Sequence, residues 1–388
     1  MNSRQRIIAA MNLETPDRVP LMCQFSIGSM MLQLETNPYM FWYDKHVYAD
    51  GLIELCQKFK FDGILVSLHG HSDKWKENLE KIETIREGYK LHYNNRTEIH
   101  TLVDLPFVSF KKPQIEIDIN DIDIEKDIPS NINNIPVSHG LYFDLNEDSM
   151  FDVFDILYSK VGDSVSIHGE ITSPFDYFLD LLGYQNGLMA LMLEPEKCKL
   201  IIKKYADGVS KIANLMCDKH IDAIKISSPF AGMGFISLEQ YEEFVLPYER
   251  EVIATIRAKG KHVYIHTCGS IGDRLEMMCL SGVSGLECLD PYPLGNVDLE
   301  DAFNRVGDKI FIKGNIDSVN TLLAADNEQA KSEITKTIKI GKSKGKGFIL
   351  STACSIAPRV TKERLLMMSA LIEQHGYYKN KMSIGCCT

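Results

Sequence analysis

Residues 262–290 read HVYIHTCGSIGDRLEMMCLSGVSGLECLD, and this stretch contains the repeating unit that decides the fold. A short apolar run at 262–269 is separated by a helix-length segment from a second short run at 285–290. Short apolar runs that alternate with helical segments are typical of βαβ units, in which consecutive strands lie parallel. The stretch therefore predicts two neighbouring strands of a parallel sheet.

The same unit recurs along the chain. Six further short runs, rich in β-branched and apolar residues, lie at 19–25, 63–69, 164–170, 223–228, 309–315 and 347–354. Between them, Pro174 and Pro195 suit the first turn of a helix, and Ser237 with Gln240 has the spacing of a capping box. Eight alternating βα units predict an α/β fold, a closed (β/α)8 TIM-type barrel with an N-terminal extension. We expect residues 1–388 to form this single barrel domain.

The segment 88–135 departs from the alternation. It contains a predicted hairpin around Asn94 and Asn95, followed by an acidic, isoleucine-rich stretch interrupted by prolines. We interpret it as an inserted or capping segment. Because active sites of TIM barrels lie at the C-terminal ends of the strands, the insertion would either roof the site or cover the opposite end.

Composition indicates a globular protein, since the chain is 45% hydrophobic and 24% charged. The net charge of −11 argues against a nucleic-acid partner. Without a long apolar run or a recognisable secretory signal, we expect no membrane association and a cytoplasmic location. In such a reducing compartment the ten cysteines would be core residues, thiols or metal ligands, and Cys386 and Cys387 would belong to a frayed tail.

Four residues at predicted strand ends have the chemistry of metal ligands. His266 and Cys268 are two positions apart on one strand and so share a face. Glu287 ends the next strand and Cys354 ends the last, which places all four around one barrel mouth. Imidazole, thiolate and carboxylate donors suit zinc, and a labile oxygen ligand could yield to a substrate. We therefore predict a catalytic zinc site with His266, Cys268, Glu287 and Cys354 as ligands.

Other polar residues at the strand ends are predicted to serve catalysis or substrate binding. The catalytic candidates are Glu170, His168 and Asp290, and the substrate-binding candidates are His69, His71, Ser228 and Asn315. For His168 and Glu170, a buried and satisfied polar pair is the alternative interpretation. For Asp290, which precedes Pro291, the alternative is ordinary turn chemistry.

Several motifs resemble the uroporphyrinogen decarboxylase superfamily across nearly the whole chain. They are SRQRIIAAM at 3–11, TPDRVP at 15–20, GEITSPFD at 169–176, FVLPY at 244–248 and HTCG at 266–269. The chain is most similar to the methyltransferase branch. Its zinc signature, His-x-Cys plus a distant cysteine, corresponds to His266, Cys268 and Cys354, and cobalamin-independent methionine synthase is similar in placing a glutamate where Glu287 stands.

This resemblance implies a function. The methyltransferases of this branch move a methyl group between the cobalamin of a separate corrinoid protein and a small substrate, either a thiol acceptor such as coenzyme M or an O-methyl donor such as a methoxylated aromatic. The eight units and the insertion leave no spare domain for cobalamin, so we expect the corrinoid on a partner protein. Zinc would make a bound thiol a thiolate, or would act as a Lewis acid on a methyl ether oxygen.

Two other functions remain open. A metal-independent decarboxylase of a uroporphyrinogen-like tetrapyrrole needs arginines for the propionates, but the corresponding stretch VPLMCQFSIGSM at 19–30 has none. The aspartate expected at the end of the fourth strand is Ser228 here. A non-catalytic accessory subunit that holds a corrinoid partner is the other alternative, and it would lack an open zinc position.

Overall fold

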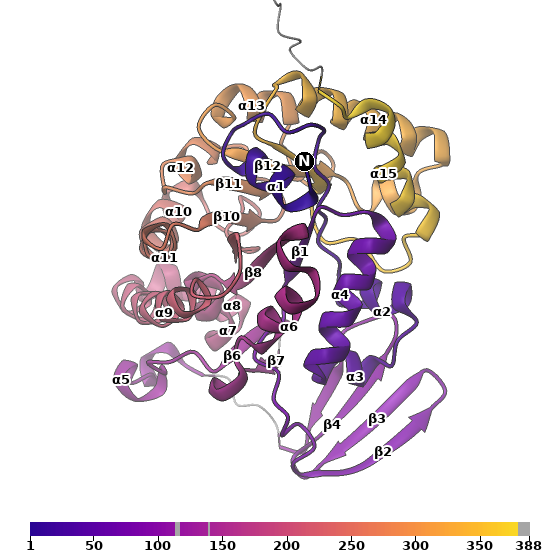
Figure 1. Cartoon of the computed structure of the whole chain (residues 1–388). Coiled ribbons are helices and arrows are strands. Elements are labelled where there is room, and N and C mark those ends of the chain that lie inside the picture. Colours follow the sequence, from indigo (N-terminus) through magenta and orange to yellow (C-terminus); the bar gives the residue numbers. More distant parts are fainter. Residues whose placement is uncertain (113–116, 139, 379–388) are drawn as a thin grey trace, which may run out of the picture.

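Seven parallel strands form one sheet in a computed structural model that describes residues 1–112, 117–138 and 140–378. Cys386 and Cys387 lie outside the described residues. The strand order is β1-β8-β9-β10-β11-β12-β13, as expected for consecutive βα units (Figure 1). The bounds are β1 Gly63–Val66, β8 Ser166–Thr172, β9 Ala223–Ser227, β10 His262–Thr267, β11 Gly285–Cys288, β12 Phe311–Ile316 and β13 Phe348–Thr352.

The first predicted strand, at 19–25, closes the barrel without forming a continuous strand. Its backbone forms two hydrogen bonds with β13. Met22 N donates to Leu350 O at 3.0 Å, and Leu350 N donates to Pro20 O at 2.8 Å. On the other side, Asp62 N donates to Leu21 O at 2.7 Å, directly before β1. Pro20 has no N–H to donate, which helps to limit the pairing to isolated bridges. The predicted α/β barrel is confirmed, with an irregular first member.

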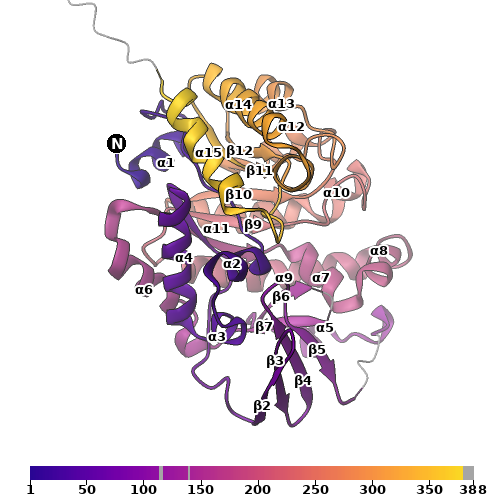
Figure 2. The same ribbon diagram turned by 90° about the vertical axis from the view of Figure 1, so that its right-hand side faces the viewer.

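Helices cover the outside of the sheet (Figures 1 and 2). Pro174 and Pro195 lie in the first turns of α7 and α9, and Ser237 and Gln240 form the predicted capping box of α10. No helix among the described residues is long and apolar enough to cross a membrane. The helices are α1 Ser3–Met11, α2 Ile27–Leu34, α3 Pro38–Tyr43, α4 Lys45–Phe59, α5 Ile124–Asp127, α6 Asp152–Val161, α7 Pro174–Leu182, α8 Tyr184–Leu193, α9 Pro195–Met216, α10 Leu238–Phe244, α11 Leu246–Ala258, α12 Leu275–Cys279, α13 Leu299–Val306, α14 Asn327–Ser343 and α15 Lys362–His375.

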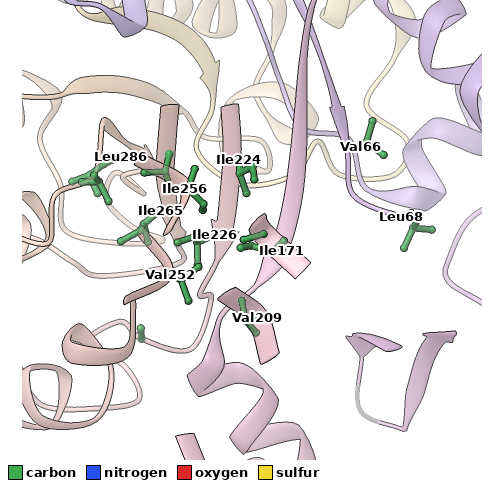
Figure 3. Packing of buried hydrophobic residues seen from close by; sticks show 14 of the residues in the cluster. Val66, Leu68, Ile171, Val209, Ile224, Ile226, Val252, Ile256, Ile265 and Leu286 are labelled. Carbon is green, nitrogen blue, oxygen red and sulfur yellow. The ribbon is translucent and has the colours of Figure 1, made fainter. Parts of the chain in front are cut away.

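The main core lies between the strands and these helices. Ile224 and Ile226 of β9 are completely buried and face the same side as Val209 of α9 and Val252 of α11 (Figure 3). Because successive side chains of a strand alternate between faces, Lys225 between them faces the barrel interior. The outward residues of the barrel strands thus supply the main apolar core. The inward residues include polar groups such as Lys225 and a second, smaller apolar cluster that contains Leu65, Ala223, Tyr264, Phe311 and Ile349.

The insertion is longer than the predicted 88–135 at both ends. A four-stranded antiparallel sheet, β2 Leu79–Ile85, β3 Gly88–Tyr93, β4 Arg96–Thr101 and β5 Phe107–Phe110, is followed by a pair, β6 Asn134–Ser138 and β7 Leu141–Asp144. The predicted hairpin at Asn94 and Asn95 joins β3 to β4. The sheet projects from the barrel (Figure 2). Residues 104–105 and 135–137 line a cavity together with Glu170 and Ser227, so the insertion roofs the C-terminal mouth.

Candidate functional site

Three of the four predicted ligands meet at the C-terminal mouth of the barrel. His266 lies in β10, Cys268 directly follows that strand, and Cys354 follows β13. The His266 Nε2 atom is 3.3 Å from the Cys268 Sγ atom, and the two cysteine Sγ atoms are 3.7 Å apart. The three donor atoms all lie within 4.8 Å of one another. They form a compact group of one imidazole and two thiols, which we call the His-Cys-Cys group.

The geometry of the His-Cys-Cys group suits zinc. Two sulfur ligands at about 2.3 Å from a tetrahedral zinc would lie about 3.8 Å apart, close to the 3.7 Å between Cys268 and Cys354. Contact with Cys268, with the His266 imidazole nearby, holds the pKa of the Cys354 thiol far below its usual range. Thiolate is the form that binds a metal. Three protein donors also match catalytic zinc sites, which keep one position for substrate.

The backbone around Cys268 is held by a neighbouring loop. Gly269 has a φ of +75°, a left-handed conformation that favours glycine. Its N–H donates to Asp290 Oδ2 at 2.7 Å, and the Cys288 thiol lies 3.2 Å from the same oxygen. Cys288 and Leu289 also have positive φ values, which turn the chain back after β11. The predicted catalytic candidate Asp290 thus fixes the loop that presents Cys268.

Glu287 differs from the expectation that it is the fourth ligand. Within the described residues it is not part of the His-Cys-Cys group. Its Oε2 atom instead lies 3.0 Å from His266 Nδ1, the nitrogen remote from Cys268, and its Oε1 atom accepts a bond from Lys313. The reason is register, because His266, Glu287 and Lys313 are direct neighbours on β10, β11 and β12. Glu287 is therefore placed to orient the imidazole.

Sequence reasoning missed a buried charge network beneath the site. Lys225 and Lys313 are completely buried. Lys225 Nζ lies 2.9 Å from Glu170, 3.7 Å from Glu287 and 2.6 Å from the amide oxygen of Gln24. Burial opposes the charge of Lys225, but Glu170 and Glu287 raise its pKa overall. A lysine amid the apolar residues of β9 was the signal that could have revealed it.

The other two catalytic candidates, Glu170 and His168, lie at different depths in the barrel. Glu170 lines the cavity at the mouth and pairs with Lys225. His168 is completely buried, with Ser166 Oγ and Tyr264 OH each 3.1 Å from its ring nitrogens. Burial lowers the pKa of His168 to about 3, so the ring is neutral. The structure thus places Glu170 at the site and His168 in the barrel interior.

Two of the four substrate-binding candidates, His69 and His71, pack against aromatic residues between positions 143 and 154. His69 stacks on Phe151 with ring centroids 5.6 Å apart, and burial lowers its pKa to about 4. His71 packs edge-on against Phe143 and lines a separate cavity of about 620 Å³ beside the antiparallel sheet. None of the residues that line this cavity belongs to the His-Cys-Cys group. The structure therefore does not bring His69 or His71 to the His-Cys-Cys group.

The remaining two, Ser228 and Asn315, have structural contacts. Ser228 is completely buried, and its backbone N–H donates to His266 O at 2.8 Å. Asn315 Nδ2 donates to Leu289 O at 3.0 Å and so supports the turn after β11. Neither residue lines the cavity at the mouth, whereas Ser227 does. Ser228 and Asn315 support the backbone around the His-Cys-Cys group.

Fold and site together define a class of protein, the α/β barrels with one histidine and two cysteines gathered at the C-terminal mouth. The profile of the uroporphyrinogen decarboxylase (URO-D) family matches residues 127–375. The chain belongs to the uroporphyrinogen decarboxylase family, as the sequence motifs indicated.

Two curated relatives and one solved structure extend the comparison. The methylcobamide:CoM methyltransferase MtbA of Methanosarcina acetivorans is 22% identical over 380 residues, which cover 96% of this chain and 98% of the relative. The uroporphyrinogen decarboxylase of Prochlorococcus marinus is 26% identical over 270 residues, which cover 67% and 71%. A solved methyltransferase from Methanosarcina mazei shares the fold, with a TM-score of 0.69, 18% identity and coverage of 96% and 99%. The predicted similarity to the methyltransferase branch is confirmed.

Proposed function

We propose that this protein is a zinc-dependent methyltransferase that moves a methyl group between the cobalamin of a separate corrinoid protein and a small substrate. The observation that carries the proposal is the His-Cys-Cys group, held at the barrel mouth by Glu287 and Asp290. Full-length similarity to a methylcobamide:CoM methyltransferase supports the reaction class. The small substrate is a thiol acceptor or an O-methyl donor such as a methoxylated aromatic.

His266, Cys268 and Cys354 would hold the metal. When bound, zinc stabilises a substrate thiolate or acts as a Lewis acid on an ether oxygen. Glu287 fixes the orientation of His266 by accepting from its Nδ1 atom, as carboxylates do for metal-bound histidines elsewhere. Lys225 and Lys313 keep Glu287 ionised, since the two ammonium groups lower the pKa of this buried carboxyl far below its usual value. We place this activity in the cytoplasm, where cysteines stay reduced.

The alternative activity, decarboxylation of a uroporphyrinogen-like tetrapyrrole, suits the site less well. Such a substrate carries several carboxylates, which favour arginine or lysine partners. The described residues that line the cavity at the mouth include no arginine or lysine, and four of them are acidic, namely Asp104, Glu170, Asp176 and Asp180. Because these described lining residues offer no arginine or lysine to the carboxylates of a tetrapyrrole, they favour the methyltransferase over the decarboxylase.

The metal content of the purified protein tests the proposal. We expect about one zinc per chain and a zinc-edge X-ray absorption spectrum with two sulfur ligands, from Cys268 and Cys354. A third sulfur on adding a thiol would identify the thiol as the methyl acceptor. Protein that was never exposed to chelators and contains no tightly bound metal would overturn the proposal and favour the decarboxylase or the accessory subunit.

The first testable prediction concerns Cys354. We expect Cys354→Ser to reduce zinc affinity by at least tenfold and to abolish methyl transfer, because it removes one of two thiolates. Far-ultraviolet circular dichroism should show that the barrel stays folded. The matched control is Cys279→Ser on α12, which changes a cysteine outside the His-Cys-Cys group. A zinc-free Cys354→Ser protein that keeps full activity would refute the mechanism.

A further inference from the structure

The antiparallel sheet of the insertion forms one side of the cavity of about 620 Å³ that His71 lines. The cavity lies between strands β3, β4 and β5 of this sheet, strand β7 and helix α3 (Figure 2). Its volume is typical of small-molecule sites, which measure about 300–1,000 Å³. None of the described residues that line it also lines the cavity at the barrel mouth. We call it the insertion cavity.

Aromatic rings line the insertion cavity. Trp42, Tyr93 and Phe143 belong to its wall and are each at most 4% exposed. The rings of Trp42 and Phe143 meet edge to face with centroids 5.3 Å apart, and the ring of Tyr43 stacks on that of Trp75 at 4.9 Å. Aromatic rings bind one another through such stacked and edge-to-face contacts. The wall therefore favours a planar aromatic ligand.

The charged groups of the wall favour a neutral ligand over an ion. Arg96 and Glu98 neutralise each other through a 2.6 Å contact, and Glu98 also accepts a hydrogen bond from Tyr43 OH at 2.6 Å. The other charged residues among the described lining are exposed and carry both signs, namely Lys74, Glu77, Asp144 and Glu147. Water and salt screen such exposed charges. An ion that entered the inner part of the cavity would lose its hydration and meet only a charge pair that is already balanced.

His71 adds a buried polar group to this wall. It is 2% exposed, and neither of its ring nitrogens has a hydrogen-bond partner in the described part of the chain. Burial lowers the pKa of His71 to about 3, so its ring is neutral and has one N–H donor and one acceptor nitrogen. Buried groups without a partner cost free energy, which a ligand that bonds to them recovers. A hydroxyl group both donates and accepts, so it can pair with either nitrogen.

We propose that the insertion cavity binds a neutral aromatic compound with a hydroxyl group on its ring, a member of the phenol class. The aromatic side chains of the wall contact the ring of the ligand, and His71 bonds to its hydroxyl group. The site is separate from the His-Cys-Cys group, since none of the described residues that line the cavity belongs to that group. The inference therefore goes beyond the proposed methyl transfer and does not depend on it.

The tryptophans of the chain allow binding in this cavity to be followed. The sequence has two, Trp42 and Trp75, and both line the insertion cavity. Protein that contains fluorotryptophan at both positions gives two fluorine NMR signals, which Trp75→Phe assigns. We expect phenol to shift both signals in a saturable way. Cys354→Ser, with its reduced zinc affinity, should show the same shifts, whereas loss of the shifts in this variant would place phenol at the metal and overturn the proposal.

Four compounds with a single benzene ring test the class of ligand. Phenol is neutral and has a hydroxyl group, toluene is neutral and has no hydrogen-bonding group, benzoate is an anion, and benzylammonium is a cation. We expect the Kd of phenol to be at least about threefold lower than that of either ion, because the inner wall offers no unpaired charge among its described residues. Tighter binding of benzoate or benzylammonium would show an ion site and refute the inference. If phenol shifted neither tryptophan signal, the proposal would also fail.

Two variants connect binding to the wall. His71→Phe keeps a ring but removes both nitrogens, so it should lower the ratio of phenol to toluene affinity about fivefold. An unchanged ratio would show that His71 does not bind the hydroxyl group.

Phe110→Ala changes a residue of β5 that lines the cavity and is 38% exposed, so folding is not at risk. It should weaken phenol binding about two- to fivefold. The matched control is Phe107→Ala on the same strand, which is 66% exposed and is not among the described residues of the lining. Equal effects of the two alanine variants would show that phenol does not bind in the insertion cavity.

Discussion

Neutralising Glu287 should destabilise the barrel strongly, because its charge balances the network beneath the site. Two lysines, Lys225 and Lys313, are completely buried, and two carboxylates face them, Glu287 at 1% exposure and Glu170 at 12%. The four charges sum to zero. Glu287→Gln keeps the shape of the side chain but leaves one positive charge uncompensated. Breaking a buried ion pair in this way costs about 3–5 kcal/mol of unfolding free energy.

Urea denaturation followed by circular dichroism, with a chelator present so that metal binding does not contribute, measures the effect. The double variant Glu287→Gln/Lys313→Met restores a net charge of zero in the network. It should recover at least half of the unfolding free energy that Glu287→Gln loses. The control is Glu276→Gln, which breaks an exposed pair with Arg305 and should cost less than about 1 kcal/mol. A single variant within about 1 kcal/mol of wild type, or a double variant less stable than the single one, would refute the reasoning.

Two further predictions concern stability. Burial raises the pKa of Asp176 to about 8 and that of Glu249 to about 7, so the folded state binds more protons than the unfolded state. The stability that these two groups contribute is complete below about pH 4 and is lost as the pH rises toward 8. Urea unfolding midpoints measured from pH 5 to 9 should therefore fall more steeply for the wild type than for the double variant Asp176→Asn/Glu249→Gln. Parallel pH profiles would contradict this. Asp62 is completely buried and accepts hydrogen bonds from Arg6 at 2.6 Å, Arg18 at 3.1 Å and the backbone N–H of Leu21 at 2.9 Å. We therefore expect Asp62→Asn to lower the free energy of unfolding by about 3–5 kcal/mol. The control is Asp163→Asn, which breaks an exposed pair with Arg4 and should cost less than about 1 kcal/mol. Equal urea midpoints for the two variants would show that the buried ion pairs of Asp62 stabilise the protein no more than the exposed pair of Asp163.

The strands and the proximity of His266 to Cys268 could be predicted because periodicity and spacing along one strand determine them locally. Seven predicted runs are strands, and the side chains of His266 and Cys268 meet as their spacing on one strand requires. The segment at 19–25 pairs only in part, because Pro20 lacks an N–H and the pairing also depends on β13, far along the sequence.

The partners of buried charges could not be predicted in the same way. Alternation along β11 places Glu287 inside the barrel, but only the register with β10 and β12 shows that it lies between His266 and Lys313. The insertion was predicted too short because Leu79–Ile85 is mostly exposed and has weak apolar alternation. Ser228 and Asn315 were predicted from their positions at strand ends, and their backbone contacts depend on loops whose conformation a sequence does not show.

The pairing of residues 20–24 with residues 350–356 has a consequence for biosynthesis. A ribosome makes the first partner more than 300 residues before the second, so the barrel cannot close until residues 350–356 have been made. Until Leu350 emerges, the N-terminal segment and the exposed edge of β1 remain open to other chains. The last of the paired segments to be made thus decides when these backbone groups are covered.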